Sequence, residues 1–141
     1  MARGNLSEHL YFEREDACLA DGDPVRPAAI KPPITIDHLN AVDIRAGTIR
    51  SVHDVPASDK LAKFVVDFGD RTRTILAAMK RERTDLGALV GIQALFVVNV
   101  APRRMAGELS EGMFFDLGYA DGIVPVLAVP ERPVPDGTRA G

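Results

Sequence analysis

Beyond its first 35 residues the chain is a succession of short apolar runs of strand length, separated by glycine, proline and aspartate. The clearest run spans residues 63–68, where every second side chain is large and apolar: Phe64, Val66 and Phe68. A period of two places these side chains on one face of a β-strand. The Gly-Asp pair that follows is typical of a hairpin turn. The pattern predicts an all-β domain built from short strands.

Further runs of this kind lie at 42–49, 71–76, 93–100, 112–117 and 123–129. Gly47 interrupts the first of them, which predicts a β-bulge and a curved strand there. Residues 79–89 are charged and nearly free of β-branched side chains, so we expect a short helix between the third and fourth strands. Short strands with a curved first strand and such a helix are the pattern of an OB-fold, a five-stranded Greek-key barrel. A small all-β sandwich fits the spacing of the strands almost as well.

The first 35 residues differ from the rest and predict a separate N-terminal extension. Residues 23–33 contain four prolines, a density typical of an extended linker. Before them, residues 6–19 carry apolar side chains at near-helical spacing behind Ser7, which predicts a weak amphipathic helix. We therefore divide the chain into an N-terminal extension with a proline-rich linker, residues 1–35, and one β-domain, residues 36–141. Single domains of this size are common.

Residue types that carry metal, redox or nucleophilic chemistry are sparse. Cys18 is the only cysteine, so an intramolecular disulfide and a cysteine-built zinc site are both excluded. His9, His38 and His53 stand apart from one another and lack the spacing of a metal site on a helix. The chain shows no Ser-His-Asp set and no phosphate-binding glycine loop. We expect a protein that is not an enzyme and that needs no metal or cofactor.

The sequence also predicts where the protein acts. No apolar run approaches the roughly 20 residues that a membrane-spanning helix needs. The first ten residues lack the apolar core of a secretion signal. We expect a cytoplasmic protein with no membrane partner.

The net charge of −3 does not indicate a nucleic-acid partner, and the distribution of charge is more informative than its sum. Residues 71–83 hold five basic side chains and one acidic one. The basic residues are Arg71, Arg73, Lys80, Arg81 and Arg83. In the strand at 71–76, inward packing of the threonines would point Arg71 and Arg73 outward. Any RNA site must then be a local basic patch, to which Arg71, Arg73, Lys80 and Arg81 are the candidate contributors.

The stretch at residues 99–113 joins two strand-like runs and carries two adjacent arginines. Pro102 restricts the backbone before them, and Gly107 supplies conformational freedom after them. We expect a loop at the rim of the domain, from which Arg103 and Arg104 project. The planar guanidinium fork matches phosphate oxygens, so the pair is a candidate phosphate clamp. By chemistry alone, an ordinary solvated surface pair is the alternative.

The order of residues in this stretch resembles the signature of the tRNA-binding domain family. The shared elements are Asn99, then Pro102-Arg103-Arg104, then Gly107, then Ser110-Glu111-Gly112-Met113. Further segments resemble that family's motifs in the same order: 42–49 its first strand, 57–61 a loop with Asp59-Lys60-Leu61, 66–69 a strand end, and 133–138 the closing segment. The resemblance covers residues 36–141. One departure is Val100-Ala101, where the family usually has Leu-Lys, which removes one cation.

The resemblance implies the OB-fold and assigns roles by position. The family's RNA-facing positions correspond to Asn99, Arg103, Arg104, Ser110 and Met113. Lys60 falls in the first hairpin loop, at the mouth of the expected barrel, either as a phosphate contact or as a solubilising surface residue. Of the adjacent Phe114 and Phe115, one should be core and the other a platform on which a base stacks.

For function, the resemblance implies a non-catalytic tRNA-binding module that recognises folded RNA by shape and backbone contacts, as A-form helices favour. Free-standing members of the family are homodimers, so we expect a homodimer with tRNA as its partner. An aminoacyl-tRNA synthetase is a further possible partner. The alternative is a CsaA-like export chaperone that binds unfolded precursor segments. The family includes such a chaperone, and the residues of the 99–104 and 133–138 motifs are similar to those of that subgroup.

Overall fold

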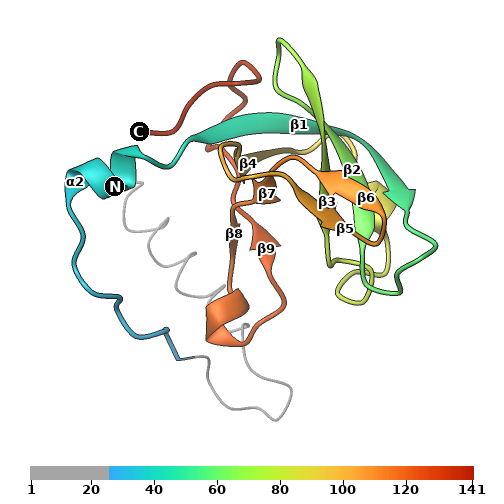
Figure 1. Ribbon diagram of the computed structural model, residues 1–141, viewed down its shortest axis with the longest axis horizontal. Helices are drawn as coiled ribbons and strands as arrows, with labels where there is room; N and C mark the ends of the chain where they lie inside the picture. Colours follow the sequence, from blue (N-terminus) through green and yellow to red (C-terminus); the bar gives the residue numbers. More distant parts are fainter. Residues whose placement is uncertain (1–25) are drawn as a thin grey trace, which may run out of the picture. The chain divides into compact units, whose positions relative to one another are not determined.

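The computed structural model describes residues 26–141, which form two compact units (Figure 1). The larger unit, residues 33–117 and 126–141, contains every strand. The smaller one joins residues 26–32 to residues 118–125, and within it the Ala28 N–H donates to the Asp121 carboxylate at 2.6 Å. The helix predicted at 6–19 lies outside the described residues.

A five-stranded antiparallel sheet forms the main body of the larger unit, with the strand order β3-β2-β1-β4-β7. Its strands are β1 (Ile44–Asp54), β2 (Ala62–Asp67), β3 (Thr72–Ala77), β4 (Gln93–Val97) and β7 (Met113–Phe114). Figure 1 shows the sheet curled, with the long β1 strand running across it. Two small hairpins complete the strands: β5 (Arg103–Met105) with β6 (Glu108–Ser110), and β8 (Asp116–Leu117) with β9 (Val126–Leu127). The prediction of a mostly-β domain is confirmed.

The core lies on one face of the sheet, where the alternation predicted for residues 63–68 is confirmed. Phe64 and Val66 are completely buried, and Phe68 is nearly so. Phe114 joins them, with its ring centroid 4.9 Å from that of Phe64. Phe115, the next residue, is 44% exposed. Phe114 is therefore the core member of the phenylalanine pair, because successive strand residues face opposite ways.

The irregularity in β1 lies at Arg50, where the pairing with β2 shifts register between Ile49 and Ser51. The prediction of a bulge at Gly47 is wrong. Gly47 is in regular pairing with β4, and a Cβ there would lie 2.7 Å from the side chains of both Val66 and Phe68. This glycine makes room for core side chains and does not interrupt the strand.

The condition that would point Arg71 and Arg73 outward, inward packing of the threonines, is not met in β3. Ile75 is completely buried, whereas Thr72 is exposed. Arg73 lies on the same side as Ile75, because both alternate with the threonines, and it pairs with the buried Val66 of β2. Burial of the large isoleucine removes more apolar surface from water than burial of threonine does. Arg73 is consequently drawn inward, to the end of the core.

Helical structure is limited among the described residues. It comprises the α-helix α2 (Ile36–Asn40) and two 3₁₀ turns, η1 (Leu86–Leu89) and η2 (Tyr119–Asp121). The Thr35 hydroxyl caps α2 by accepting from the His38 N–H at 3.4 Å. In place of a helix over 79–89, only the four residues of η1 are helical, with Leu89 buried against the core. No helix in residues 26–141 is long and apolar enough to cross a membrane.

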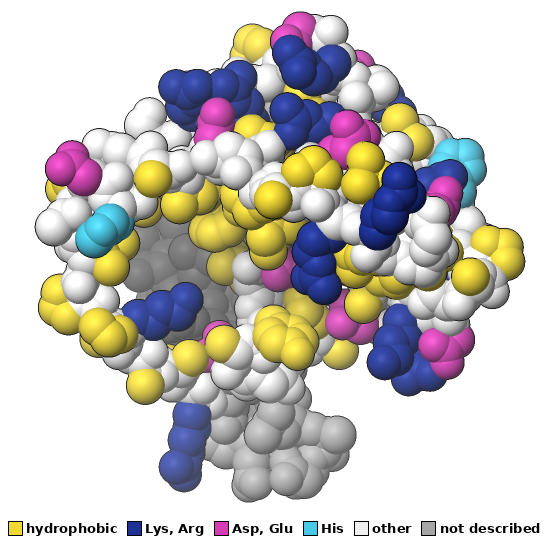
Figure 2. Space-filling view, viewed as in Figure 1, with side chains coloured by type: hydrophobic (Ala, Val, Ile, Leu, Met, Phe, Trp, Pro, Cys, Tyr) yellow, Lys and Arg dark blue, Asp and Glu magenta, His cyan; other side chains and the backbone are white. Residues whose placement is uncertain are grey.

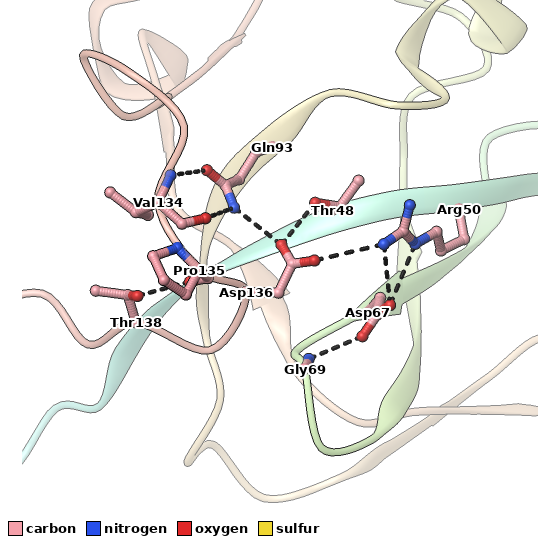
Figure 3. Close-up of polar contacts among 9 residues, drawn as sticks. All are labelled: Thr48, Arg50, Asp67, Gly69, Gln93, Val134, Pro135, Asp136 and Thr138. Carbon is pink, nitrogen blue, oxygen red and sulfur yellow. Dashed lines mark hydrogen bonds and ion pairs between the residues drawn. The ribbon is translucent and has the colours of Figure 1, made fainter.

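The C-terminal tail is held along β1 without forming a long strand, in agreement with its proline content. Backbone hydrogen bonds join Gly137 and Thr138 to Ala46, at 2.8 and 2.9 Å. Figure 3 shows the polar centre of this attachment, the Asp136 carboxylate. It accepts from the Thr48 hydroxyl at 2.6 Å and from the Gln93 amide at 2.9 Å. The tail thus fastens β1 and β4 together on one side of the sheet.

Candidate nucleic-acid interface

The stretch predicted as a rim loop contains a regular β-hairpin. Strands β5 and β6 pair Arg103 with Ser110 and Arg104 with Leu109. Ala106 and the glycine after it turn the chain with φ of 51° and 82°, and positive φ at both central residues is what a type I′ turn requires. The prediction of a loop is therefore wrong for residues 103–110, and the arginines sit on a structured element.

Arg103 and Arg104 are both exposed. Within residues 26–141 neither guanidinium makes a hydrogen bond or an ion pair. Because the two are neighbours in a strand, they project from opposite faces of the hairpin. They therefore present two separate sets of hydrogen-bond donors and do not form one clamp around a single phosphate.

The β6 leg of the hairpin is attached to the edge strand β3. The Ser110 side chain is 4% exposed; its hydroxyl accepts from the Leu76 N–H at 3.0 Å and donates to the Gly112 carbonyl at 3.1 Å. The Glu111 N–H donates to the Thr74 carbonyl at 2.8 Å. Ser110, predicted to face RNA, lies against β3 with its hydroxyl occupied by backbone groups.

Asn99 also has backbone partners. Its side-chain oxygen accepts from the Asp43 N–H at 2.9 Å, and its amide nitrogen donates to the Ala41 carbonyl at 2.7 Å. The amide thereby ties the chain after β4 to the segment between α2 and β1. Its position in the sequence suggested a base contact, whereas in the fold it holds two segments together.

A polar cavity of about 190 Å³ opens beside Asn99. Its lining is Asp43, Arg45, Phe68, Asp70, Arg71, Arg73, Val98 and Asn99. The Asp43 carboxylate lies 3.0 Å from Arg45 Nε and 3.4 Å from Arg139 Nε. The hydrogen bond from Arg45 and the positive charges of both arginines hold the pKa of Asp43 below its usual value. Positive charge in this cavity is therefore already partly neutralised.

The basic window at 71–83 does not form one surface. Arg71 precedes β3 and pairs with Asp70 at 3.3 Å, whereas Lys80 and Arg81 follow the same strand. A strand rises about 3.3 Å per residue, so the two ends of this six-residue strand are separated by roughly 20 Å. The five basic side chains fall into two groups that cannot act on one phosphate.

At the far end of β3, most cations are occupied. The Lys80 ammonium donates to the Val55 and Ser58 carbonyls at 3.0 and 2.6 Å, and Arg81 forms an ion pair with Asp59. The hydrogen bond and charge of Arg81 lower the pKa of Asp59. Lys60 differs: it is exposed, and its ammonium makes no hydrogen bond or ion pair with the described part of the chain. Figure 2 shows this mixture of basic and acidic side chains on its right-hand side.

The exposed apolar row on β7 and β8 was missed by the sequence reasoning. Met113 is 50% exposed and Leu117 54%, and with Phe115 they occupy alternate positions on one face. Val126, which pairs with Leu117 in β9, is exposed as well. The signal was present as a period of two over residues 113–117. Met113 thus lies at the surface, among apolar neighbours.

Other features that sequence reasoning considered add no further site. No group of three or more His, Cys, Asp or Glu side chains within residues 26–141 could hold a metal ion. A second hollow of about 540 Å³ lies between the tail and β1, and its lining includes Thr48, Gln93 and Asp136. None of the predicted site residues lines it.

Known proteins resemble this chain over its whole β-domain. The family model described as "Putative tRNA binding domain" matches residues 44–139. A methionine–tRNA ligase of Bacteroides fragilis is 38% identical over 110 residues, which are 78% of this chain and 16% of that enzyme. A methionine–tRNA ligase of Methanococcus maripaludis is 36% identical over 106 residues, 75% of this chain and 16% of its own. The chain thus spans about 16% of the length of these curated relatives.

Solved structures give the same result. A MetRS related protein from Pyrococcus horikoshii superposes with a TM-score of 0.72 at 25% identity, covering 79% of this chain and all of that one. The chaperone CsaA from Bacillus anthracis superposes with a TM-score of 0.66 at 26% identity, covering 78% of this chain and all of its own. A curled antiparallel sheet carrying an exposed basic hairpin defines a small β-domain. The chain belongs to the family of tRNA-binding domains.

Proposed function

We propose that this protein is a non-catalytic tRNA-binding module that recognises folded RNA by its shape and backbone, acting in the cytoplasm where tRNA is found. The observation that carries the proposal is the β5–β6 hairpin, whose Arg103 and Arg104 are exposed and unpaired among the described residues. Cations without internal partners are the ones available to phosphates. The curled sheet is, in this proposal, the five-stranded Greek-key barrel of an OB-fold, with its short helix at η1.

The residues divide by role. Arg103 and Arg104 contact phosphates directly, and Lys60 contributes a third contact, because the tip of the hairpin points toward its loop. That direction follows from two contacts of residues 108–111: the Glu108 carboxylate lies 3.0 Å from the Lys63 ammonium, and the Glu111 N–H donates to the Thr74 carbonyl. Met113 offers a polarizable surface to a base, and Asn99 and Ser110 hold the backbone of the site.

Arg71 and Arg81 are secondary contacts in this proposal. Both are exposed, but each is already paired with an aspartate on the surface. Lys80 and Arg73 donate to backbone carbonyls and support the structure more than they serve RNA. The electrostatic contribution then comes from about three strong phosphate contacts, which predicts modest affinity with a clear salt dependence.

The test is filter binding of bulk tRNA across a salt series. We expect wild-type protein to retain tRNA at low salt and Arg103→Ala plus Arg104→Ala to lower both the affinity and the salt slope. The matched control is Arg26→Ala plus Arg132→Ala, which removes the same charge from two exposed arginines outside the hairpin. Failure of wild-type protein to bind tRNA at low salt, or equal losses in both variants, would refute the proposal.

We also propose that the protein is a homodimer. Phe115, Leu117 and Val126 form an exposed apolar face, and such faces commonly mark protein contacts. Twofold pairing through this face would place two arginine hairpins on one assembly, so that both act on a single folded RNA. Light scattering of wild-type protein and Phe115→Glu checks this: we expect a dimer and a monomer, and a wild-type monomer at micromolar concentration would contradict the proposal.

A second candidate function is a chaperone that binds unfolded segments of exported proteins. The same exposed apolar face supports it, together with the structural similarity to the chaperone CsaA. An unfolded precursor peptide added in the same salt series separates the two functions. Peptide binding that ignores salt and both hairpin arginines, but is lost in Phe115→Glu, favours the chaperone.

The relatives suggest one more partner. The curated relatives contain this domain as part of methionine–tRNA ligases, so we include an aminoacyl-tRNA synthetase among the proposed partners. Added protein should then increase tRNA retention by a synthetase in the same binding experiment. An unchanged retention would remove this partner from the proposal.

A further inference from the structure

We infer that Arg73 is a positioning residue. It fixes the base of the β5–β6 hairpin, where the chain leaves and rejoins the sheet at Val98 and Glu111, and it does not itself contact RNA. The inference deepens the proposed function and rests on it for the part that concerns RNA. Its structural part concerns only the hairpin and can be tested without RNA. Charge and position in the sequence had suggested instead that Arg73 is a phosphate contact.

The geometry of the Arg73 guanidinium carries the inference. Its Nη1 donates to the Val98 carbonyl at 2.6 Å and to the Glu111 carbonyl at 3.2 Å. Val98 follows β4 and Glu111 follows β6. One nitrogen therefore joins the two ends of the segment that carries both hairpin arginines.

The sheet leaves these two carbonyls in need of a donor. The β4–β7 ladder ends at the pair Val97 and Met113, and Val98 and Glu111 lie just beyond it, half-buried. Unpaired carbonyls shielded from water are costly, and a guanidinium carries enough donors to serve several acceptors at once. Arg73 thus continues the hydrogen bonding that the ladder cannot, at the point where the hairpin leaves the sheet.

Neighbouring hydrogen bonds fix the same base of the hairpin. Ser110 and Glu111 bind the backbone of β3 at Leu76 and Thr74, and Arg73 belongs to that same strand. The hairpin is accordingly fastened to one edge strand through both backbone and side chains. Prior ordering of this kind improves affinity, because the cost of ordering is not paid on binding.

The first experiment needs no RNA. Limited trypsin digestion, followed by mass spectrometry, measures cleavage after Arg103 and Arg104 as a report on local opening. We expect Arg73→Gln to increase cleavage at these positions about fivefold, and Ser110→Ala to do the same without any change in charge. The matched control is Arg50→Gln, which removes an arginine held by Asp67 and Asp136 (Figure 3) and should leave hairpin cleavage unchanged. Unchanged cleavage in folded Arg73→Gln would overturn the inference.

The second experiment is tRNA filter binding across a salt series. We expect Arg73→Gln to lower the affinity about fivefold with the salt slope of the wild type, because no phosphate contact is lost. In the background Arg103→Ala plus Arg104→Ala, the same change should have no further effect. A slope lower by about one, with a loss that adds to that of the hairpin variant, would identify Arg73 as a direct phosphate contact and overturn the inference.

The two experiments separate the inference from the proposed function. If wild-type protein does not bind tRNA, the proposed function fails, while digestion still decides whether Arg73 orders the hairpin. If tRNA binds and hairpin cleavage does not respond to Arg73→Gln, only the inference fails. Should Arg73→Gln not fold, Arg73→Lys replaces it in both experiments, since the lysine keeps the charge but lacks the fork; wild-type behaviour of that variant in both would overturn the inference.

Discussion

The β5–β6 hairpin and the basic window at 71–83 are both rich in cations, but they differ in what those cations hold. In the hairpin, Arg103 and Arg104 have no partner among the described residues. In the window, Arg73 and Lys80 donate to backbone carbonyls. Arg71 pairs with an adjacent aspartate. The hairpin has fewer basic residues, yet it has more charge available to a ligand.

The comparison teaches that the number of basic residues in a segment is a poor measure of its attraction for phosphate. A guanidinium that binds a carboxylate must exchange one anion for another when RNA arrives, so its net gain is small. An unpaired guanidinium releases only counterions. Variants in both regions test this distinction between unpaired and occupied cations.

The largest effect is expected on tRNA affinity when two arginines are removed from the hairpin and, for comparison, two from the basic window. Arg103→Ala plus Arg104→Ala should lower tRNA affinity about 30-fold at low salt and reduce the salt slope by about two. Arg71→Ala plus Arg81→Ala should lower it about threefold, because both side chains already have acidic partners. Filter binding of both variants measures the difference, and equal losses would remove the distinction between the regions.

A pair of lysines separates structural from ligand-binding roles. Lys80→Ala should lower the free energy of unfolding by about 1–3 kcal/mol, because the Val55 and Ser58 carbonyls lose their donor. Lys60→Ala should leave stability unchanged and reduce the salt slope of tRNA binding by about one. Urea denaturation and filter binding on both variants measure this. A Lys80 variant of wild-type stability would contradict the assignment.

Freeing the occupied arginines should produce a smaller gain. Asp59→Asn plus Asp70→Asn removes the carboxylates that pair with Arg81 and Arg71, and we expect tRNA affinity to rise about threefold at low salt. The gain should disappear at high salt, since exposed charges are screened there. Glu131→Gln is a control that removes a single carboxylate: it frees the exposed Arg132 in the tail and should leave binding unchanged. A rise in both variants would show only a general effect of net charge.

The smallest effect concerns acid stability at the polar cavity. The hydrogen bond from Arg45 lowers the pKa of Asp43 from its ordinary value of 3.8. A folded-state pKa below the unfolded one means that this carboxylate stabilises the fold above the unfolded value and ceases to do so as pH falls through the folded one. Asp43→Asn should therefore lose less stability than the wild type between about pH 4 and pH 2. Thermal unfolding across this range measures the difference, and parallel profiles would contradict it.

Much of the fold was predictable because strand periodicity depends on neighbours in the chain. The alternation in 63–68 correctly predicted which face of β2 is buried. In 71–76 two faces were plausible by pattern, because the burial of Ile75 is decided only once the opposing Phe64 is known. Gly47 looks like a bulge in sequence, and only the Phe68 and Val66 side chains packed over it reveal a close contact.

The candidate site was predictable to a lesser extent. The order of residues in 99–113 led to the arginine pair, but the turn that makes a hairpin rests on Ala106 at positive φ, which the residue type does not predict. Asn99 and Ser110 occupy the family's positions, yet their polar groups bind backbone atoms far away in the chain. The role of Arg73 depends on two carbonyls whose position follows from the pairing of β4 with β7.

The amino-acid sequence by itself determined which segments become strands and which residues carry charge, since both depend on residue type and local spacing. It also determined family membership through the order of its motifs. Only the tertiary structure decided which charges are free. Partners such as Val98 for Arg73 or Val55 for Lys80 come from segments that are distant in the chain, just after β4 and β1. Coulomb and hydrogen-bond energies depend on distances in space that the sequence does not contain.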